Sequence, residues 1–329
     1  MLTKRQNLLE TIHGGNPDRY VNQFEAFALV RGTPMSKVNP MPKRGEMNVV
    51  NAWGVTRSWP ENVPGAFPVH DSEHIVIKDV SHWRDYVKIP EVVFPAQEWE
   101  PFIKAAQEID RNEYFVTAMI APGVFEQCHY LLEMVNCLTA LYEYPDEMHE
   151  IIDMLTDWEL RWAAELCKYI QPDAILHHDD WGSRTSTFMS PEMFEEFYLA
   201  PYEKIYGFYK SHGVEVVVHH SDSYAATLVP YMIKMGIDIW QGCMRSNDIP
   251  ALIRQYGGRI SFMGGLDNAD LDKEDWTPEL IRDAVRQAIA EGSRYYYIPC
   301  AAGGGPGSTY PGVYDCISKE IDAVNSELE

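Results

Sequence analysis

The chain has 329 residues, of which 46% are hydrophobic and 23% are charged, and its formal net charge is -22 at pH 7. This is the composition of an ordinary globular protein with enough apolar material for a large core. The negative charge argues against nucleic-acid binding, since phosphates require the opposite sign. It indicates either a well-solvated surface or an acidic face for docking a protein partner.

No apolar run approaches the roughly 20 residues that a membrane helix needs. Residues 1–15 (MLTKRQNLLETIHGG) have an amphipathic helical pattern and lack the apolar core of a signal peptide. We therefore expect a soluble, cytoplasmic protein without a membrane partner. The six cysteines include no CxxC pair, which indicates buried thiols in a chain of this size. The sequence is compatible with a monomer and with a homodimer.

The first elements in the chain are a helix and a strand. Thr3 and Gln6 form a capping box, and apolar residues follow it on one helical face. Residues 20–27 (YVNQFEAF) are predicted to form the first strand. Residues 34–100 are rich in proline, tryptophan and charge, with weak periodicity, which is typical of an insertion or lid at the rim of a domain.

Strands and amphipathic helices alternate through the rest of the chain. Ser190-Pro191 and Thr277-Pro278 each open a helix, with the hydroxyl residue as N-cap and proline in the first turn. Apolar residues at helical spacing predict a core helix over 148–166, and a last helix is expected over 312–328. The predicted strands are short β-branched or aromatic runs at residues 114–120, 174–177, 214–218, 237–240, 260–263 and 294–298.

This alternation, without a signal for chain reversal, predicts a parallel sheet and an α/β fold. Seven strands are predicted, and an eighth could lie within residues 48–80. No GxGxxG follows the first strand and no P-loop is present, which argues against nucleotide-binding folds. We therefore expect one (β/α)8 TIM-like barrel domain over residues 1–329, with residues 34–100 as its insertion or rim.

In a parallel barrel, the active-site residues come from the C-terminal ends of the strands. Several predicted strand ends carry ligand-type side chains here, whereas a typical buried strand end carries one. They are Glu25, the runs His177-His178-Asp179-Asp180 and His219-His220-Ser221-Asp222, Gln241 and Cys300. We expect Glu25, Asp180, His220 and Cys300 to converge at one mouth of the barrel.

His220 and Cys300 are the predicted metal pair, because imidazole and thiolate together favour zinc. A carboxylate of Asp222, Asp180 or Glu25 would complete a three-ligand site with an open position, where zinc would act as a Lewis acid. Two alternatives stay open: Cys300 as a buried small thiol, and Asp222 as the N-cap of a following helix.

The catalytic candidates are the carboxylates at these strand ends. Adjacent residues of a strand face opposite sides, so only one of Asp179 and Asp180 should point into the barrel mouth. Repulsion between neighbouring carboxylates would raise the pKa of one of them and favour a general acid. The full set is Asp180, Asp179, Glu25 and Asp222.

Aromatic residues and a glycine-rich loop predict binding surfaces. The loop AAGGGPGSTYPG contains Gly303, Gly304 and Gly305, whose backbone N–H groups could cradle a phosphate, with a plain flexible loop as the alternative. Core packing is the alternative for the aromatic residues. The candidates for a flat substrate pocket are Trp53, Trp181, Tyr297, His178 and Gln241.

Several of these stretches together resemble the uroporphyrinogen decarboxylase superfamily. They are NLLETIHGGNPDR, LHHDDWGSRTSTFMSPEMFEEFYLAPYEKIYGFYKSHG, VVHHSDSYAATLVPYMIKMGIDIWQG, NDIPALIRQYGGRISFMGGLDN and GSRYYYIPCAAGGGPGSTYPGVYDCI. The resemblance covers most of residues 1–30 and 110–325, and it implies the barrel fold.

The superfamily has two main functional branches. Decarboxylases carry an N-terminal Arg-Gln-Ala-Gly-Arg run that grips substrate carboxylates. The predicted first-strand end here, NQFEAF at residues 22–27, supplies no arginine and one acid, Glu25. A polycarboxylate would be repelled there, so we expect this chain to fall outside the decarboxylase branch.

The other branch transfers methyl groups between small molecules and a cobalamin-bearing protein. Its thiol-methylating members bind zinc through His-x-Cys and a later Cys, whereas this chain has Asp222 in place of the first Cys and retains His220 and Cys300. A harder ligand suits the activation of an oxygen. The segments HHDDWG and AWGV resemble those of methyltransferases that demethylate methyl ethers.

The resemblance therefore implies a methyltransferase, the O-demethylase component that moves a methyl group from a methoxylated aromatic, or another small donor, to cob(I)alamin. That cobalamin would be carried by a partner corrinoid protein, with its tail phosphate at Gly303–Gly305. The alternatives are a decarboxylase-type lyase, a methylcobalamin:thiol methyltransferase, and a non-catalytic corrinoid- or metal-binding module.

Overall fold

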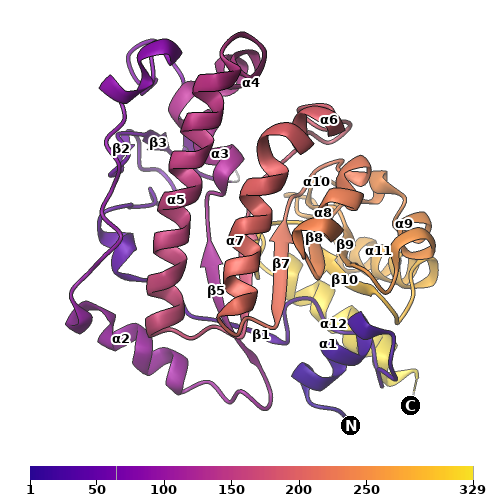
Figure 1. Ribbon diagram of the computed structural model, residues 1–329. Helices are drawn as coiled ribbons and strands as arrows, with labels where there is room; N and C mark the ends of the chain where they lie inside the picture. Colours follow the sequence, from indigo (N-terminus) through magenta and orange to yellow (C-terminus); the bar gives the residue numbers. More distant parts are fainter. Residues whose placement is uncertain (64, 329) are drawn as a thin grey trace.

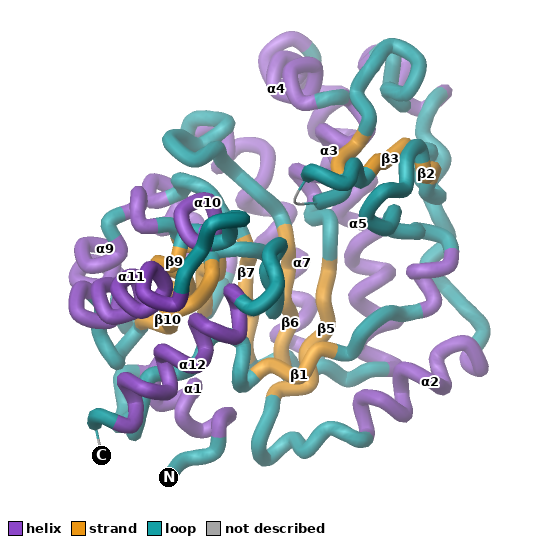
Figure 2. Tube along the Cα trace, turned by 180° about the vertical axis from the view of Figure 1, so that it is seen from behind, coloured by secondary structure: helices purple, strands orange, loops and turns teal. Residues whose placement is uncertain are grey.

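The computed structural model describes residues 1–63 and 65–328. Its centre is a curled sheet of seven parallel strands in the order β1-β5-β6-β7-β8-β9-β10 (Figure 2). This arrangement is consistent with a TIM-like barrel. The strands are β1 (Phe27–Leu29), β5 (Phe115–Ile120), β6 (Ala174–His178), β7 (Val216–His220), β8 (Ile239–Cys243), β9 (Ser261–Leu266) and β10 (Tyr297–Ala301).

Helices surround the sheet, and α5 and α7 run along the outer side of its first strands (Figure 1). None of the helices in the described ranges is both long and apolar enough to cross a lipid bilayer. The α-helices are α1 (Lys4–His13), α2 (Ala96–Gln107), α3 (Val124–Leu132), α4 (Met134–Glu143), α5 (Pro145–Tyr169), α6 (Pro191–Phe194), α7 (Ala200–Ser211), α8 (Val229–Met235), α9 (Ile249–Tyr256), α10 (Asn268–Leu271), α11 (Pro278–Glu291) and α12 (Val313–Ser326).

Four short 3-10 helices and one π-helical stretch are also present in the described ranges. The 3-10 helices are η1 (Pro34–Lys37), η2 (Val80–Asp85), η4 (Ala226–Leu228) and η5 (Arg245–Asn247), and the π-helical stretch η3 (Glu195–Leu199) joins α6 to α7.

Local capping explains where several helices begin. The Thr3 hydroxyl accepts a hydrogen bond from the Gln6 backbone N–H, and the reciprocal bond completes the predicted capping box of α1. Ser190 caps α6 and Thr277 caps α11 in the same way, each followed by proline in the first helical turn. These predicted helix starts are confirmed.

The first strand differs from the prediction. Residues 20–27 were expected to form it, but Gln23 has a φ of 50°, in the left-handed region, and the chain turns before β1 begins at Phe27. Val21 and Phe24 are buried against the interior cluster without belonging to a strand. A short run with buried apolar residues therefore imitates a strand, and β1 ends at Leu29 rather than Phe27.

The eighth strand expected within residues 48–80 is not part of the parallel sheet. The strands in that segment are β2 (Val49–Val50), β3 (Thr56–Ser58) and β4 (Phe67–Pro68), which form a separate antiparallel sheet. Figure 1 shows β2 and β3 away from the main sheet. These strands are only two or three residues long, and their backbone groups form hydrogen bonds with one another rather than with the main sheet.

Two apolar layers hold the fold together. The interior of the curled sheet is filled by side chains such as Leu176, Val218 and Met263, and Leu8 and Ile12 of α1 join that cluster. A larger cluster lies between the sheet and the outer helices, where apolar residues of α5 and α7 pack. Because the interior is filled below, polar side chains at the C-terminal strand ends face one mouth of the sheet.

Candidate active site

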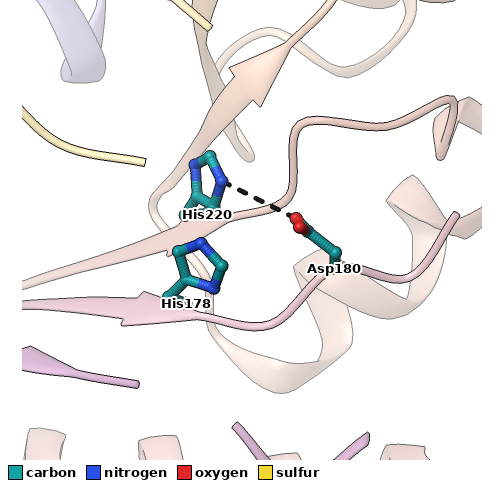
Figure 3. Close-up of side chains that lie close together, drawn as sticks. All are labelled: His178, Asp180 and His220. Carbon is teal, nitrogen blue, oxygen red and sulfur yellow. Dashed lines mark ion pairs between the residues drawn. The ribbon is translucent and has the colours of Figure 1, made fainter. Parts of the chain in front are cut away.

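Three side chains converge where β6 and β7 end. His178, Asp180 and His220 each offer one ligand atom, and these atoms all lie within 4.8 Å of one another. The parallel pairing of β6 and β7 places His178 beside His220, with ring centroids 4.4 Å apart (Figure 3). Asp180 follows in the next loop, and its Oδ1 lies 3.6 Å from His220 Nε2. This His–Asp–His group is the single cluster of metal-ligand type among the described residues.

Both imidazoles are held by their Nδ1 atoms. His178 Nδ1 lies 3.0 Å from a carboxylate oxygen of Glu126 on α3, and His220 Nδ1 lies 2.5 Å from Gln241 Oε1 on β8. The Gln241 amide nitrogen donates in turn to the carbonyl oxygens of Ala301 and Gly303. This arrangement leaves Nε2 of both rings for another partner, as in metal sites where an outer group orients each histidine.

Gly304 leaves the space in front of these nitrogens. A Cβ atom at this position would lie 3.0 Å from His178 Nε2 and 3.2 Å from His220 Nε2. The two nitrogens therefore point at the same region, which only a residue without a side chain keeps open.

The donor set fits a metal ion. Two imidazole nitrogens and one carboxylate oxygen suit zinc, and three protein ligands leave an open position of the catalytic type. Burial, assisted by nearby His178, lowers the pKa of His220 to about 4, so this imidazole is in the neutral form that a metal requires. Burial opposes protonation of His178, but the Glu126 carboxylate outweighs it and raises the pKa of His178 to about 10. This imidazole must therefore release its Nε2 proton when a metal ion binds.

The two adjacent aspartates separate as strand alternation predicts. Asp180 faces the histidines, and its Oδ1 accepts the Asp222 backbone N–H at 3.0 Å. Asp179 is fully buried on the other side, where its carboxylate accepts the backbone N–H groups of Phe125 and Glu126 at the start of α3. Asp179 therefore caps a helix, which does not fit the catalytic role expected for it.

Asp222 lies beside the His–Asp–His group and does not cap a helix. The next helix, η4, has Ala225 as N-cap and no side-chain cap, so the alternative reading of Asp222 as an N-cap is wrong. Desolvation by the surrounding protein and the charge of Asp180 raise the pKa of Asp222 to about 8, although Asp222 is exposed at the mouth of the sheet, where solvent weakens such a shift. Asp222 is absent from the convergent metal group, although it was expected to be a ligand.

Cys300 and Glu25 are not among the grouped ligand atoms, contrary to the expected convergence. Cys300 lies inside β10, fully buried in the interior cluster, where burial raises the pKa of its thiol and the neighbouring Gln241 side chain, which also holds His220, opposes that shift. Glu25 precedes β1, at the opposite end of that strand from the histidines, and bonds to the Asn22 backbone N–H with Arg19 3.9 Å away. The expected pair of His220 with Cys300 is therefore not among the grouped ligand atoms, and the expected first-strand acid is at the wrong end.

A cavity of about 810 Å³ meets the histidine group at Gly304, although His178, Asp180 and His220 do not line it themselves. Its wall is largely apolar and includes Trp53, Trp59, Trp158 and Trp162, while Gly304 belongs both to this wall and to the histidine contact. Such a concave, aromatic-lined space is typical of a small-molecule site.

The other predicted binding residues divide between the cavity and the core. Trp53 lines the cavity, whereas Trp181 is fully buried with its ring stacked on His219 at 3.8 Å. Tyr297 is also buried, and its hydroxyl donates to the Gly264 carbonyl. The structure therefore supports the core-packing alternative for these two residues, while His178 and Gln241 lie at the site as described.

The loop with Gly303, Gly304 and Gly305 forms one rim of the cavity. The Gly303 backbone N–H already donates to Asn268 Oδ1, and the Gly305 N–H donates to the Gly303 carbonyl. Two of the three amides expected to cradle a phosphate thus have partners within the protein.

Four ionisable residues at the cavity were not predicted from the sequence. Arg31, Arg44 and Asp272 line the cavity, and Glu159 lines it from α5. Glu159 stands on the apolar helical stripe that includes Leu155 and Trp162, so an acid at that spacing is a signal that could have been noticed. Arg31 was not recognised as a residue that follows the first strand, because that strand was predicted to end at Phe27 rather than Leu29.

Comparisons with known proteins agree with this fold. The family profile described as uroporphyrinogen decarboxylase (URO-D) matches residues 49–311. A solved methyltransferase from Methanosarcina mazei covers 99% of this chain and 99% of its own, with a TM-score of 0.69 and 15% identity. A B12-independent methionine synthase from Shewanella sp. W3-18-1 covers 74% of this chain and 69% of its own, with a TM-score of 0.46 and 17% identity. No curated protein matches the sequence.

Proposed function

Because the chain belongs to the uroporphyrinogen decarboxylase family, we propose that it is a methyltransferase of that family, which moves a methyl group from a methoxylated aromatic to the cobalamin of a partner corrinoid protein. One observation carries this proposal: a tryptophan-walled cavity adjoins a His–Asp–His group whose free imidazole nitrogens point toward its rim. The overall likeness to a solved methyltransferase supports it.

The cavity suits a flat apolar donor. Trp53, Trp158 and Trp162 contribute indole faces, against which an aromatic ring can pack edge-on or offset. A volume of about 810 Å³ exceeds what one ring with methoxy substituents fills and leaves room for the methyl acceptor to approach.

His178, Asp180 and His220 would hold a zinc ion at the edge of this cavity. When bound, the ion would supply a Lewis acid for the donor oxygen, which makes the phenolate a better leaving group. Glu126 and Gln241 orient the two imidazoles for this role. A set of nitrogen and oxygen ligands suits oxygen better than a thiol, which disfavours the alternative of a thiol methyltransferase.

The rim of the cavity is a braced loop. Asp272 accepts the backbone N–H groups of Thr309 and Tyr310, and Asn268 holds Gly303. We infer that this rim and the tryptophan-rich segment 34–100 receive the corrinoid protein, whose cobalamin would act as methyl acceptor. Excluding water there protects the reacting groups.

A second candidate, decarboxylation of a polycarboxylate, is favoured by one specific observation. The expectation that no arginine follows the first strand is wrong, because β1 ends at Leu29 and Arg31 then lines the cavity. Arg44 lines it as well. Glu25, on which the argument against decarboxylation rested, is at the other end of the strand and cannot repel a substrate in this cavity.

The test compares the two reactions directly. The purified protein with reduced cobalamin, supplied free or on a corrinoid protein, should form methylcobalamin and a phenol from methoxyarenes such as 2-methoxyphenol. The same protein should release no carbon dioxide from uroporphyrinogen. Decarboxylation at an enzymatic rate, with no methylcobalamin from any donor, would reverse the choice in favour of the second candidate.

A further inference from the structure

Glu159 is a buried acid in the apolar part of the cavity. Among the described residues, the cavity wall contains two carboxylates, those of Glu159 and Asp272. Both oxygens of Asp272 accept hydrogen bonds that brace the rim loop. Glu159 is only 3% exposed and stands on α5 between the cavity-lining residues Leu155 and Trp162. Burying a carboxyl group in such surroundings costs free energy unless a hydrogen-bond partner or an opposite charge offsets the lost solvation.

His177 binds one oxygen of this carboxyl group. His177 Nε2 lies 2.6 Å from Glu159 Oε1, and His177 is fully buried at the end of β6. The His177 ring is enclosed by Tyr202 and Tyr206, with centroids 5.8 and 5.3 Å away. Gly123 closes the remaining side, since a Cβ there would lie 2.7 Å from His177 Cε1.

The hydrogen bonds define the form of the pair. His177 Nδ1 has no hydrogen-bond partner among the described residues. A buried N–H without an acceptor is costlier than a free lone pair, so the tautomer with the proton on Nε2 fits best. His177 then donates to Glu159 Oε1. Glu159 Oε2 has no hydrogen bond within the described chain and is not among its enclosed unpartnered atoms, so it is left for a molecule in the cavity.

We propose that Glu159 is the general acid that protonates the leaving oxygen of the methyl donor; this inference rests on the proposed methyl transfer. In the step, the bond between the methyl carbon and the aryl oxygen breaks, while the electron pair of the reduced cobalamin, cob(I)alamin, forms the new bond to the methyl carbon. The aryl oxygen would be polarised by zinc, and Glu159 would supply its proton. The bonding electron pair stays on the aryl oxygen, which takes the proton from Glu159 Oε2. The product leaves as a neutral phenol, and Glu159 remains as a carboxylate that His177 stabilises by its hydrogen bond.

The experiment uses leaving groups of different basicity. Full-length wild-type protein, Glu159→Gln and Glu165→Gln are assayed for methylcobalamin formation from 4-methoxyphenol and from 4-nitroanisole. A basic aryl oxide needs the proton, whereas nitrophenolate leaves without one. We expect Glu159→Gln to lose about 10²- to 10⁴-fold with 4-methoxyphenol, and to lose little with 4-nitroanisole.

Glu165 is the matched control, because it is another buried glutamate of α5 and does not line the cavity. The ratio of the two rates within one preparation does not depend on how much of the variant is folded. If Glu159→Gln does not fold, Glu159→Asp takes its place, because it keeps the acid. Its rate with 4-methoxyphenol, divided by its rate with 4-nitroanisole, should be near the wild-type ratio and well above the ratio of Glu159→Ala.

Two results would overturn the assignment. An unchanged rate ratio in Glu159→Gln, with an active wild type, contradicts the acid role of Glu159 and leaves the proposed function standing. A wild type that forms no methylcobalamin from either donor contradicts both.

Discussion

The orientation of two imidazole rings decides what the site can bind. Glu126 and Gln241 each occupy the Nδ1 atom of one histidine, so both Nε2 atoms are directed at the space that Gly304 leaves open. Asp180 adds a carboxylate oxygen within ligand distance of this pair. Cys300, by contrast, is fully buried in the interior cluster, where burial disfavours a thiolate even with the Gln241 side chain beside it.

The metal content of variants tests this ligand set. Wild-type protein is expected to bind roughly one zinc ion per chain after reconstitution. His220→Ala should lose it, because one of three ligands is removed, and Cys300→Ser should retain it. Mass spectrometric metal analysis after gel filtration measures both. Loss of zinc from Cys300→Ser alone would favour the thiolate ligand predicted from the sequence.

At the scale of elements, α3 depends on a strand for its first turn. The residue before it, Gly123, has no side chain to cap it, and the Asp179 carboxylate from the loop after β6 accepts its exposed N–H groups instead. The same helix carries Glu126, which positions His178. The Asp179 carboxyl group at the positive end of α3 therefore stabilises the helix that positions His178.

Removal of this cap should destabilise the protein. Asp179→Ala is expected to lower the free energy of unfolding by about 2 kcal/mol, since two buried N–H groups lose their acceptor. Asp180→Ala should cost clearly less, because Asp180 is partly exposed and accepts a single backbone bond. Urea denaturation measures both variants. Equal losses of unfolding free energy in the two variants would show that Asp179 stabilises the fold no more than Asp180 does.

At the scale of the whole molecule, residues 34–100 belong to the core as well as to the rim. Trp53, Ile77, Trp83 and Val92 of this segment are buried in the same cluster as the helices outside the sheet. Trp99, at the end of the segment, stacks on Tyr169 with ring centroids 4.8 Å apart and lies 5.5 Å from Trp162. The segment is therefore attached to the sheet through α5, whatever it contributes to partner binding.

This attachment predicts cooperative unfolding. Trp99→Ala should lower stability by about 3–5 kcal/mol, because it empties a fully buried aromatic site. The variant should still unfold in one transition, since the segment and the sheet share a core. Trp59→Ala, at a half-buried rim position, is the control and should cost much less. Calorimetry that shows two separate transitions would contradict a shared core.

The sequence by itself determined the features that a few neighbouring residues encode. The caps at Thr3, Ser190 and Thr277 were predicted correctly, because capping involves residues three positions apart. The buried strands from β5 onward were placed to within three residues at each end, because β-branched runs bounded by polar residues are local signals. Alternation also separated Asp179 from Asp180 correctly.

Only the tertiary structure decided which side chains meet. The pairing of β6 with β7 brings His178 beside His220, and α5 brings Glu159 to His177 across 18 residues of chain. The turn at Gln23 leaves Glu25 before β1, at the far end of the sheet, although residues 20–27 were predicted to form a strand. Strand register, helix docking and desolvation depend on contacts between segments distant in the chain, and those contacts decide which of several plausible ligands face the cavity.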